Sequence, residues 1–156
     1  MPATPPGTAP AVSSGCIFCA ILRGDAPASR IVDRERAVAF LTLGPLQPGH
    51  TLVVPRTHAV TLHDVSPVEW AAVAEVAREV AALQRDRLGA AGTSLFLASG
   101  EAGEQAVPHL HLHVVPRHVG DGVEMTAWWE GKVRRTTPAE LESIATRMRA
   151  PSRKGI

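Results

Sequence analysis

Three histidines alternate with apolar residues in the run His109-Leu110-His111-Leu112-His113-Val114-Val115-Pro116. Successive side chains of an extended strand point to opposite faces, so the three imidazoles would share one face, about 6–7 Å apart. A neutral imidazole whose other nitrogen is held by an acceptor can act as a nucleophile, and the phosphorus of a nucleotide is a suitable electrophile. The run therefore predicts a catalytic site, at which attack on phosphorus would give a phosphoramidate that water later cleaves.

The only two cysteines, Cys16 and Cys19, form a Cys-x-x-Cys pair. With His58 and His109 as further candidates, they offer the four ligands of a tetrahedral structural zinc site that has no open position for catalysis. Two buried thiols near a surface histidine are the alternative. A thioredoxin-like redox pair is disfavoured because no β-α-β pattern follows.

The length of 156 residues suits one domain, and 45% hydrophobic with 20% charged residues is an ordinary globular composition. A net charge of +1 provides no basic field for nucleic acid, and no apolar run approaches a membrane span of about 18 residues. We therefore expect a cytoplasmic protein without nucleic-acid or membrane partners. Residues 1–14, rich in Pro and Ala, are expected to form a disordered arm, 15–150 a single domain, and 151–156 a flexible tail.

Capping signatures predict two helices. Ser66-Pro67-Val68-Glu69 would begin a long helix that ends near Gly89, and Thr137-Pro138-Ala139-Glu140 would begin a C-terminal helix that runs to about Met148. The buried stripe of the long helix is expected at Val73, Val76, Val80 and Leu83. A short helix is expected over 20–23, and strands over 30–33, 37–41, 50–54, 94–98 and the histidine run. This order predicts an α+β fold with a mostly antiparallel sheet of about five strands.

The histidine run matches the signature His-φ-His-φ-His-φ-φ, and in it the chain resembles the histidine triad (HIT) superfamily. The resemblance extends from Cys16 to about Pro116 and is closest to the zinc-containing bacterial branch. Further motifs that carry it are Cys16-Ile17-Phe18-Cys19, Pro48-Gly49-His50-Thr51-Leu52-Val53-Val54-Pro55, Gly100-Glu101-Ala102-Gly103 and Val115-Pro116-Arg117. It implies a HIT-like fold and a homodimer that meets through the long helix and the adjacent strand.

The resemblance also implies roles for individual residues. His111 would be the nucleophile of a nucleotidyl hydrolase or transferase, and His113 and His50 would contact the phosphate and help to protonate the leaving group. The substrate would be a purine nucleotide or dinucleotide, either a dinucleoside polyphosphate or a nucleoside phosphoramidate. The residues expected to bind it are Thr42, Ser99, Gln105 and His109. The expected ligands of a structural zinc ion are Cys16, Cys19, His58 and His109.

Three positions depart from the pattern of the relatives. Thr42 stands where an acidic or amide side chain usually binds the ribose hydroxyls. Ala98-Ser99 replaces Asn-Asn, and Glu104 occupies a position that is usually Gly, where a carboxylate near an anionic substrate is unfavourable unless it points away. These changes leave open a non-catalytic nucleotide-binding regulator, and a metal-storage or redox module is a third class.

Four further residues match no expected site position. His63 and His118 are expected at the surface, and Trp128 and Trp129 in ordinary packing or a dimer contact, with a lid near the leaving group as the alternative.

Overall fold

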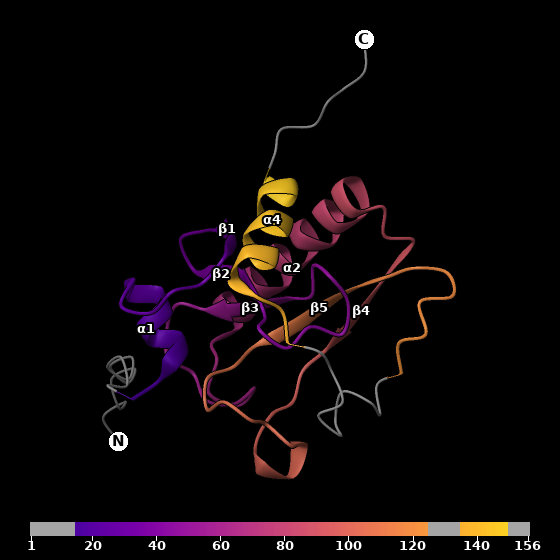
Figure 1. The fold of residues 1–156 in the computed structure, drawn as a ribbon. Helices are drawn as coiled ribbons and strands as arrows, with labels where there is room; N and C mark the ends of the chain where they lie inside the picture. Colours follow the sequence, from indigo (N-terminus) through magenta and orange to yellow (C-terminus); the bar gives the residue numbers. More distant parts are fainter. Residues whose placement is uncertain (1–14, 125–134, 150–156) are drawn as a thin grey trace, which may run out of the picture.

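The computed structural model describes residues 15–124 and 135–149 and contains an antiparallel five-stranded sheet of order β1-β2-β3-β5-β4 (Figure 1). The strands are β1 (Arg30–Asp33), β2 (Ala37–Leu41), β3 (Thr51–Pro55), β4 (Gly92–Phe96) and β5 (Leu112–Arg117). The helices are α1 (Ile17–Arg23), α2 (Pro67–Leu88) and α4 (Pro138–Arg149), with a 3₁₀ turn, η1, at Glu101–Gly103. The α+β prediction is confirmed. The proposed arm, the tail, Trp128 and Trp129 lie outside the described residues.

The central strands β2 and β3 are buried on both faces, and alternation along β2 divides its side chains between two apolar cores. Ala37, Ala39 and Leu41 pack with α2 and α4, which lie together against the sheet in Figure 1. Val38 and Phe40 point to the opposite face, where they pack with α1. In β5, Leu112 and Val114 belong to the α2 core. The side chains that alternate with them, including that of His113, therefore belong to the face that carries α1.

Both capping predictions are confirmed. The Ser66 side chain accepts from the Glu69 backbone N–H while the Glu69 carboxylate accepts from that of Ser66, and Thr137 and Glu140 form the same reciprocal pair at α4. The helix α1 begins earlier than predicted because the Cys16 thiol accepts a hydrogen bond from the Cys19 N–H and caps it. No helix of the described residues combines the length and the apolarity that crossing a membrane requires.

The buried stripe of α2 differs from the prediction at its C-terminal end. Val73, Val76 and Val80 are buried as expected, but the last member of the stripe is Gln84, which is fully buried, whereas Leu83 is only partly buried. The residues three and four positions after Val80 both lie on this face of the helix, and the apolar pattern of the sequence favoured the leucine.

The histidine strand begins three residues later than predicted, at Leu112. Its pairing with β3 ends at Leu112 and Val53, and beyond that point Pro55 has no N–H to donate. The Leu110 N–H instead donates to the carbonyl of Ala59 (2.7 Å). His109 and His111 therefore lie in a segment that leads into β5, outside the ladder. The edge strand β4 both begins and ends two residues earlier than predicted.

Gly49 forms the turn before β3, and substituting it tests how closely α2 packs against that turn. Its φ is +96°, and a Cβ there would overlap Leu88 Cδ1 of α2. Gly24 is a matched control, because its φ is +86° and a Cβ there would meet nothing within 4 Å. We expect Gly24→Ala to cost about 1 kcal/mol of unfolding free energy from backbone strain, and Gly49→Ala to cost more, because the Leu88 side chain must also shift. Urea denaturation measures both values, and equal losses would contradict the close approach of α2.

Candidate functional site

The imidazole of His111 is held in one tautomer by the backbone. Its Nδ1 lies 2.7 Å from the carbonyl oxygen of His109. Because a carbonyl can only accept, Nδ1 carries the hydrogen and Nε2 keeps its lone pair. This is the arrangement that a nucleophilic imidazole requires.

A second pair of imidazoles is joined by a direct hydrogen bond. The Leu46 N–H donates to Nδ1 of His50 (3.1 Å), so the hydrogen of His50 is on Nε2. That nitrogen lies 3.0 Å from Nδ1 of His113 and donates to it. The chain of bonds leaves Nε2 as the donor nitrogen of His113. The ring centroids of His111 and His113 are 5.1 Å apart, so this donor pair adjoins the nucleophile candidate.

Burial keeps these imidazoles neutral. Desolvation lowers the pKa of His50 from 6.5 to about 4. Desolvation, with the neighbouring His50 and His111, lowers the pKa of His113 to about 2. Desolvation also lowers the pKa of His111, although its hydrogen bond to the His109 carbonyl opposes that shift. All three imidazoles are therefore neutral near pH 7, each with a hydrogen on one nitrogen only.

Aromatic rings pack against the histidines from two elements. The Phe18 ring of α1 meets His111 edge-on at 5.2 Å and His109 at 5.8 Å between centroids. Phe96, at the end of β4, stacks on His113 at 4.2 Å with 8° between the planes. These contacts restrict the orientations of the rings and explain how the sheet and α1 together shape the site.

Cys16, Cys19, His58 and His109 form one cluster, and their four ligand atoms lie within 4.8 Å of one another. The Cys16 thiol is 3.4 Å from Nδ1 of His109, and the Cys19 thiol is 3.3 Å from Nδ1 of His58. These distances match the edge of a zinc-centred tetrahedron, roughly 3.5 Å for S···N at usual bond lengths. Nε2 of His109 donates to the Pro55 carbonyl (2.9 Å), which leaves Nδ1 unprotonated towards the thiols. The donor set therefore fits zinc.

His109 is fully buried, and both of its ring nitrogens are engaged within the protein. The structure thus places this residue in the cysteine–histidine cluster. Its expected second role in substrate binding stays a prediction.

The other expected substrate-binding residues, Thr42, Ser99 and Gln105, are partly exposed. The Thr42 hydroxyl accepts weakly from the Gly44 N–H (3.4 Å), and the Ser99 hydroxyl accepts from the Leu62 N–H (2.9 Å). Each hydroxyl keeps its own hydrogen for donation.

The Gln105 side chain holds the glycine loop, residues 100–105, through hydrogen bonds. Its Oε1 accepts from the Gly100 N–H (2.7 Å), and its Nε2 donates to the carbonyls of Val60 (2.6 Å) and Val107 (2.9 Å). This side chain fixes the shape of the loop, and a direct role at the phosphate stays a prediction.

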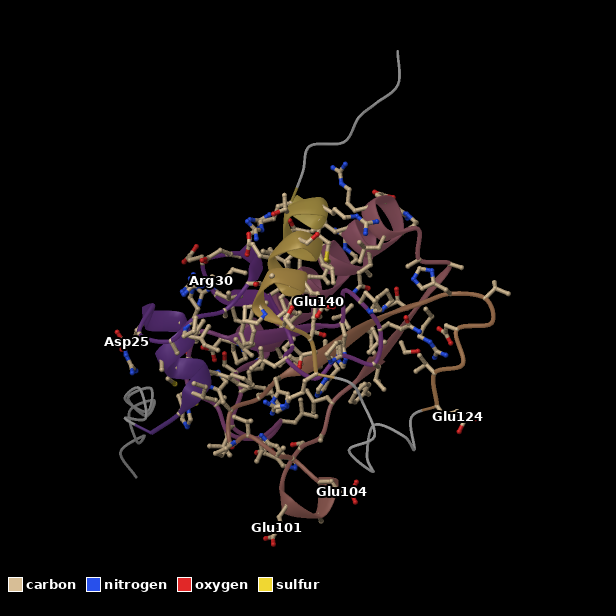
Figure 2. The ribbon with its side chains drawn as sticks, viewed as in Figure 1. Asp25, Arg30, Glu101, Glu104, Glu124 and Glu140 are labelled. Carbon is tan, nitrogen blue, oxygen red and sulfur yellow. The ribbon has the colours of Figure 1, made fainter. Side chains whose placement is uncertain are left out.

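Glu104 has a φ of +61°, the only positive φ of a non-glycine residue in the described part of the chain. This is the conformation for which Gly is preferred, which explains the backbone cost expected at this position. Figure 2 shows Glu104 and Glu101 at the outer end of the η1 loop, with their carboxylates directed away from the body of the protein. Because the Glu104 carboxylate points away from the protein body, its charge would not oppose the binding of an anionic substrate.

A cavity of about 750 Å³ lies outside the histidine cluster, between the 45–48 loop, the 121–124 loop and the first turns of α4. No triad histidine lines it. The candidate functional site is therefore the histidine cluster, because its hydrogen-bonded imidazoles can act as nucleophile and donor. Of the remaining histidines, His63 is exposed and His118 partly exposed. Sequence reasoning did not identify Phe96, Leu46 or Gln84 as residues that support the site, because none carries a motif signal.

Comparisons with known proteins agree with this geometry. The HIT domain model matches residues 23–120. Protein hit of Bacillus subtilis is 31% identical over 138 residues, which is 86% of this chain and 92% of that protein. The crystal structure of a Zn-bound histidine triad family protein from Mycobacterium smegmatis superposes with a TM-score of 0.76 at 39% identity, over 86% of this chain and 91% of that one. Adenosine 5'-monophosphoramidase hnt1 of Schizosaccharomyces pombe is 30% identical over 102 residues, 65% of this chain and 74% of that protein.

The lowered pKa values of the buried imidazoles predict a loss of stability on mild acidification. His50 titrates at 6.5 in a model peptide and at about 4 in the fold, so the unfolded chain binds the proton more tightly between those values. The stabilisation is complete above pH 6.5 and is lost as the pH falls towards 4, at about 2 kcal/mol between pH 6.5 and 5 for this imidazole.

Urea denaturation at pH 7 and pH 5 measures this dependence. The variant His50→Gln should lose about 2 kcal/mol less on acidification than the parent protein. The exposed His63 offers the control, since His63→Gln should leave the dependence unchanged. An identical pH dependence in His50→Gln and the parent would show that His50 is not neutral in the fold.

Proposed function

This chain belongs to the HIT family, and on that premise we propose that it is a nucleotidyl hydrolase or transferase that acts on the α-phosphate of a nucleotide through a covalent intermediate on His111. The observation that carries the proposal is the hydrogen bond from His111 Nδ1 to the His109 carbonyl. It leaves Nε2 with an available lone pair on an imidazole whose lowered pKa keeps it neutral. Hydrolase activity on nucleotides is in keeping with the family, which includes a relative named as an adenosine 5'-monophosphoramidase.

In the proposed reaction, Nε2 of His111 attacks the α-phosphorus. A P–N bond forms to the imidazole while the bond from phosphorus to the leaving group breaks. The leaving group takes a proton from solvent while the neutral His50–His113 pair, which lies beside the nucleophile, assists by donating a hydrogen bond to it, and the water that attacks in the second step returns a proton to solvent. Water then attacks phosphorus, the P–N bond breaks, and the nucleotide is released with His111 neutral again.

The substrate class proposed is a purine nucleotide derivative, either a nucleoside phosphoramidate or a dinucleoside polyphosphate. Thr42 would donate one hydrogen bond to a ribose hydroxyl, and Ser99 would donate near the phosphate, because both hydroxyl hydrogens are available. A single donor at Thr42 holds the ribose less firmly than a carboxylate that accepts from two hydroxyls. We therefore expect a raised KM relative to relatives with an acidic residue there.

We also propose that the cysteine–histidine cluster holds a structural zinc ion. With four protein ligands the ion has no open position, so it takes no part in the reaction and its chemistry is to cross-link the chain. The cross-link would join α1, through Cys16 and Cys19, to the segment that carries His109 and His111. The thiolate pair also supports a reducing, cytoplasmic location.

A homodimer is part of the same proposal, with α2 and the adjacent strand β4 at the contact. The strand β4 is an edge of the sheet, and Leu95 on it is exposed. An unpaired edge with an exposed apolar side chain is a surface that proteins normally cover.

The catalytic proposal is tested with His111→Ala. We expect kcat/KM for adenosine phosphoramidate and diadenosine polyphosphates to fall by roughly a thousandfold or more, and the nucleotidyl adduct seen by mass spectrometry after rapid quenching to disappear. His118→Ala is the control, because His118 lies outside the cluster, and it should retain both. An adduct that persists in His111→Ala would refute the assignment, and binding without turnover in the parent protein would favour the non-catalytic regulator.

The zinc proposal is tested with Cys19→Ser, with Ala20→Ser on the same helix as the control. Metal analysis should find one zinc per chain in the parent protein, in Ala20→Ser and in His111→Ala, and none in Cys19→Ser. Loss of the metal should lower stability by at least about 3 kcal/mol, a fall in Tm on the order of 10 °C. Turnover per folded molecule should change far less. An unchanged Tm on addition of a chelator would contradict a structural role.

A further inference from the structure

Gln84 is a polar residue in the apolar stripe of α2. Its exposed fraction is 0%, and the other buried members of that stripe are valine and alanine. An amide buried among apolar side chains is unfavourable unless its polar atoms find partners. The identity of those partners therefore indicates what the residue does.

The side-chain amide of Gln84 bridges two backbone carbonyls. Its Nε2 lies 3.0 Å from the oxygen of Gly49 and 3.0 Å from that of Val114. Both partners can only accept, so the orientation of the amide is determined by chemistry. The other amide atom, Oε1, is buried and has no hydrogen-bond partner among the described residues. An aliphatic side chain of similar size would avoid that unsatisfied atom, so packing alone does not explain a glutamine here.

The two carbonyls flank the donor pair of the site. Gly49 precedes His50, and Val114 follows His113. The β3–β5 register pairs Thr51 with Val114, and two residues further it would place Gly49 opposite Pro116. Pro116 does lie beside Gly49, since a Cβ at Gly49 would be 3.5 Å from its Cγ. Proline has no N–H, so the ladder cannot bond the Gly49 carbonyl from that side.

Gln84, on the α2 side of the sheet, donates to the Gly49 carbonyl in place of the ladder bond that Pro116 cannot make. One of its N–H groups bonds the carbonyl before His50 and the other bonds the carbonyl after His113, which ties the two chain segments to α2 and to each other. The Thr51 hydroxyl also donates to the Gly49 carbonyl (2.8 Å), but it belongs to the same strand and connects it to nothing else.

We propose that Gln84 is a positioning residue for the reaction: its amide holds the segments of His50 and His113 at the spacing that their 3.0 Å ring–ring hydrogen bond requires. The inference rests on the proposed function for its catalytic consequence. The residue does not touch the substrate and acts only through the two histidines. A misplacement on the order of 1 Å in such a pair can cost about a hundredfold in rate.

The first test compares Gln84→Met with the parent protein. Methionine matches glutamine in length and removes both N–H donors together with the unsatisfied oxygen, and Gln84→Leu repeats the loss with a branched side chain. We expect kcat to fall about tenfold to a hundredfold with KM changed less than about threefold, because binding of the nucleotide does not involve Gln84. Val80→Ala is the matched control, since Val80 is fully buried one turn earlier on the same helix. It should lower Tm without lowering kcat.

A double-mutant cycle separates positioning from general destabilisation. If Gln84 acts through His50, then Gln84→Met should lower kcat much less in a His50→Gln background than in the parent protein. Equal fold losses in the two backgrounds would overturn the proposal.

A measurement without turnover keeps this inference independent of the proposed function. In NMR spectra of ¹⁵N-labelled histidine rings, Gln84→Met should shift the signals of His50 and His113 and leave the exposed His63 unchanged, while Val80→Ala should not move them. If the parent protein turns over no nucleotide but the ring signals shift as expected, the proposed function fails and the positioning role stands. If the ring signals do not move in Gln84→Met, the positioning role fails whatever the activity.

Discussion

The carbonyl oxygen of His109 accepts a hydrogen bond from the imidazole of His111, and the remainder of the site depends on that contact. Within a regular ladder, a carbonyl points to the neighbouring strand and is bonded there. Because β5 begins only at Leu112, the His109 carbonyl lies outside the ladder and can hold the ring two residues later. The interruption of the strand is therefore what determines the tautomer of the nucleophile candidate.

The same residue connects the site to the cysteine–histidine cluster. The ring of His109 faces the two thiols through Nδ1, and its Nε2 donates to the Pro55 carbonyl. A metal ion that orients this ring also orients the carbonyl of the same residue. His109 of the cluster and the nucleophile candidate His111 thus lie two residues apart in one segment, with Phe18 packed against both rings.

Burial has two opposite consequences for the imidazoles. It lowers the pKa of His50 and His113, which keeps them neutral, and it makes every unpaired ring nitrogen costly. A directional chain of donors and acceptors from Leu46 through His50 to His113 pairs both nitrogens of His50 and Nδ1 of His113. The buried amide of Gln84 bonds the backbone on either side of this chain, where the ladder is broken by Pro116.

Local sequence signals determined much of the fold. The helix starts at Ser66 and Thr137 follow from side-chain caps that act within four residues, and the face carried by the histidines follows from alternation. Spacing likewise singled out the cysteine pair and the three alternating histidines, whereas the resemblance to the HIT superfamily indicated His58 and His109 as metal ligands and His50 as a site residue. What tertiary structure alone decided is how they meet: Cys16 reaches His109 across 93 positions, and His50 reaches His113 across 63. Tertiary structure also decided where β5 begins, which tautomers the histidines adopt, and why Gln84 is buried in place of Leu83. Each of these depends on which backbone atom from a distant part of the chain packs beside the residue.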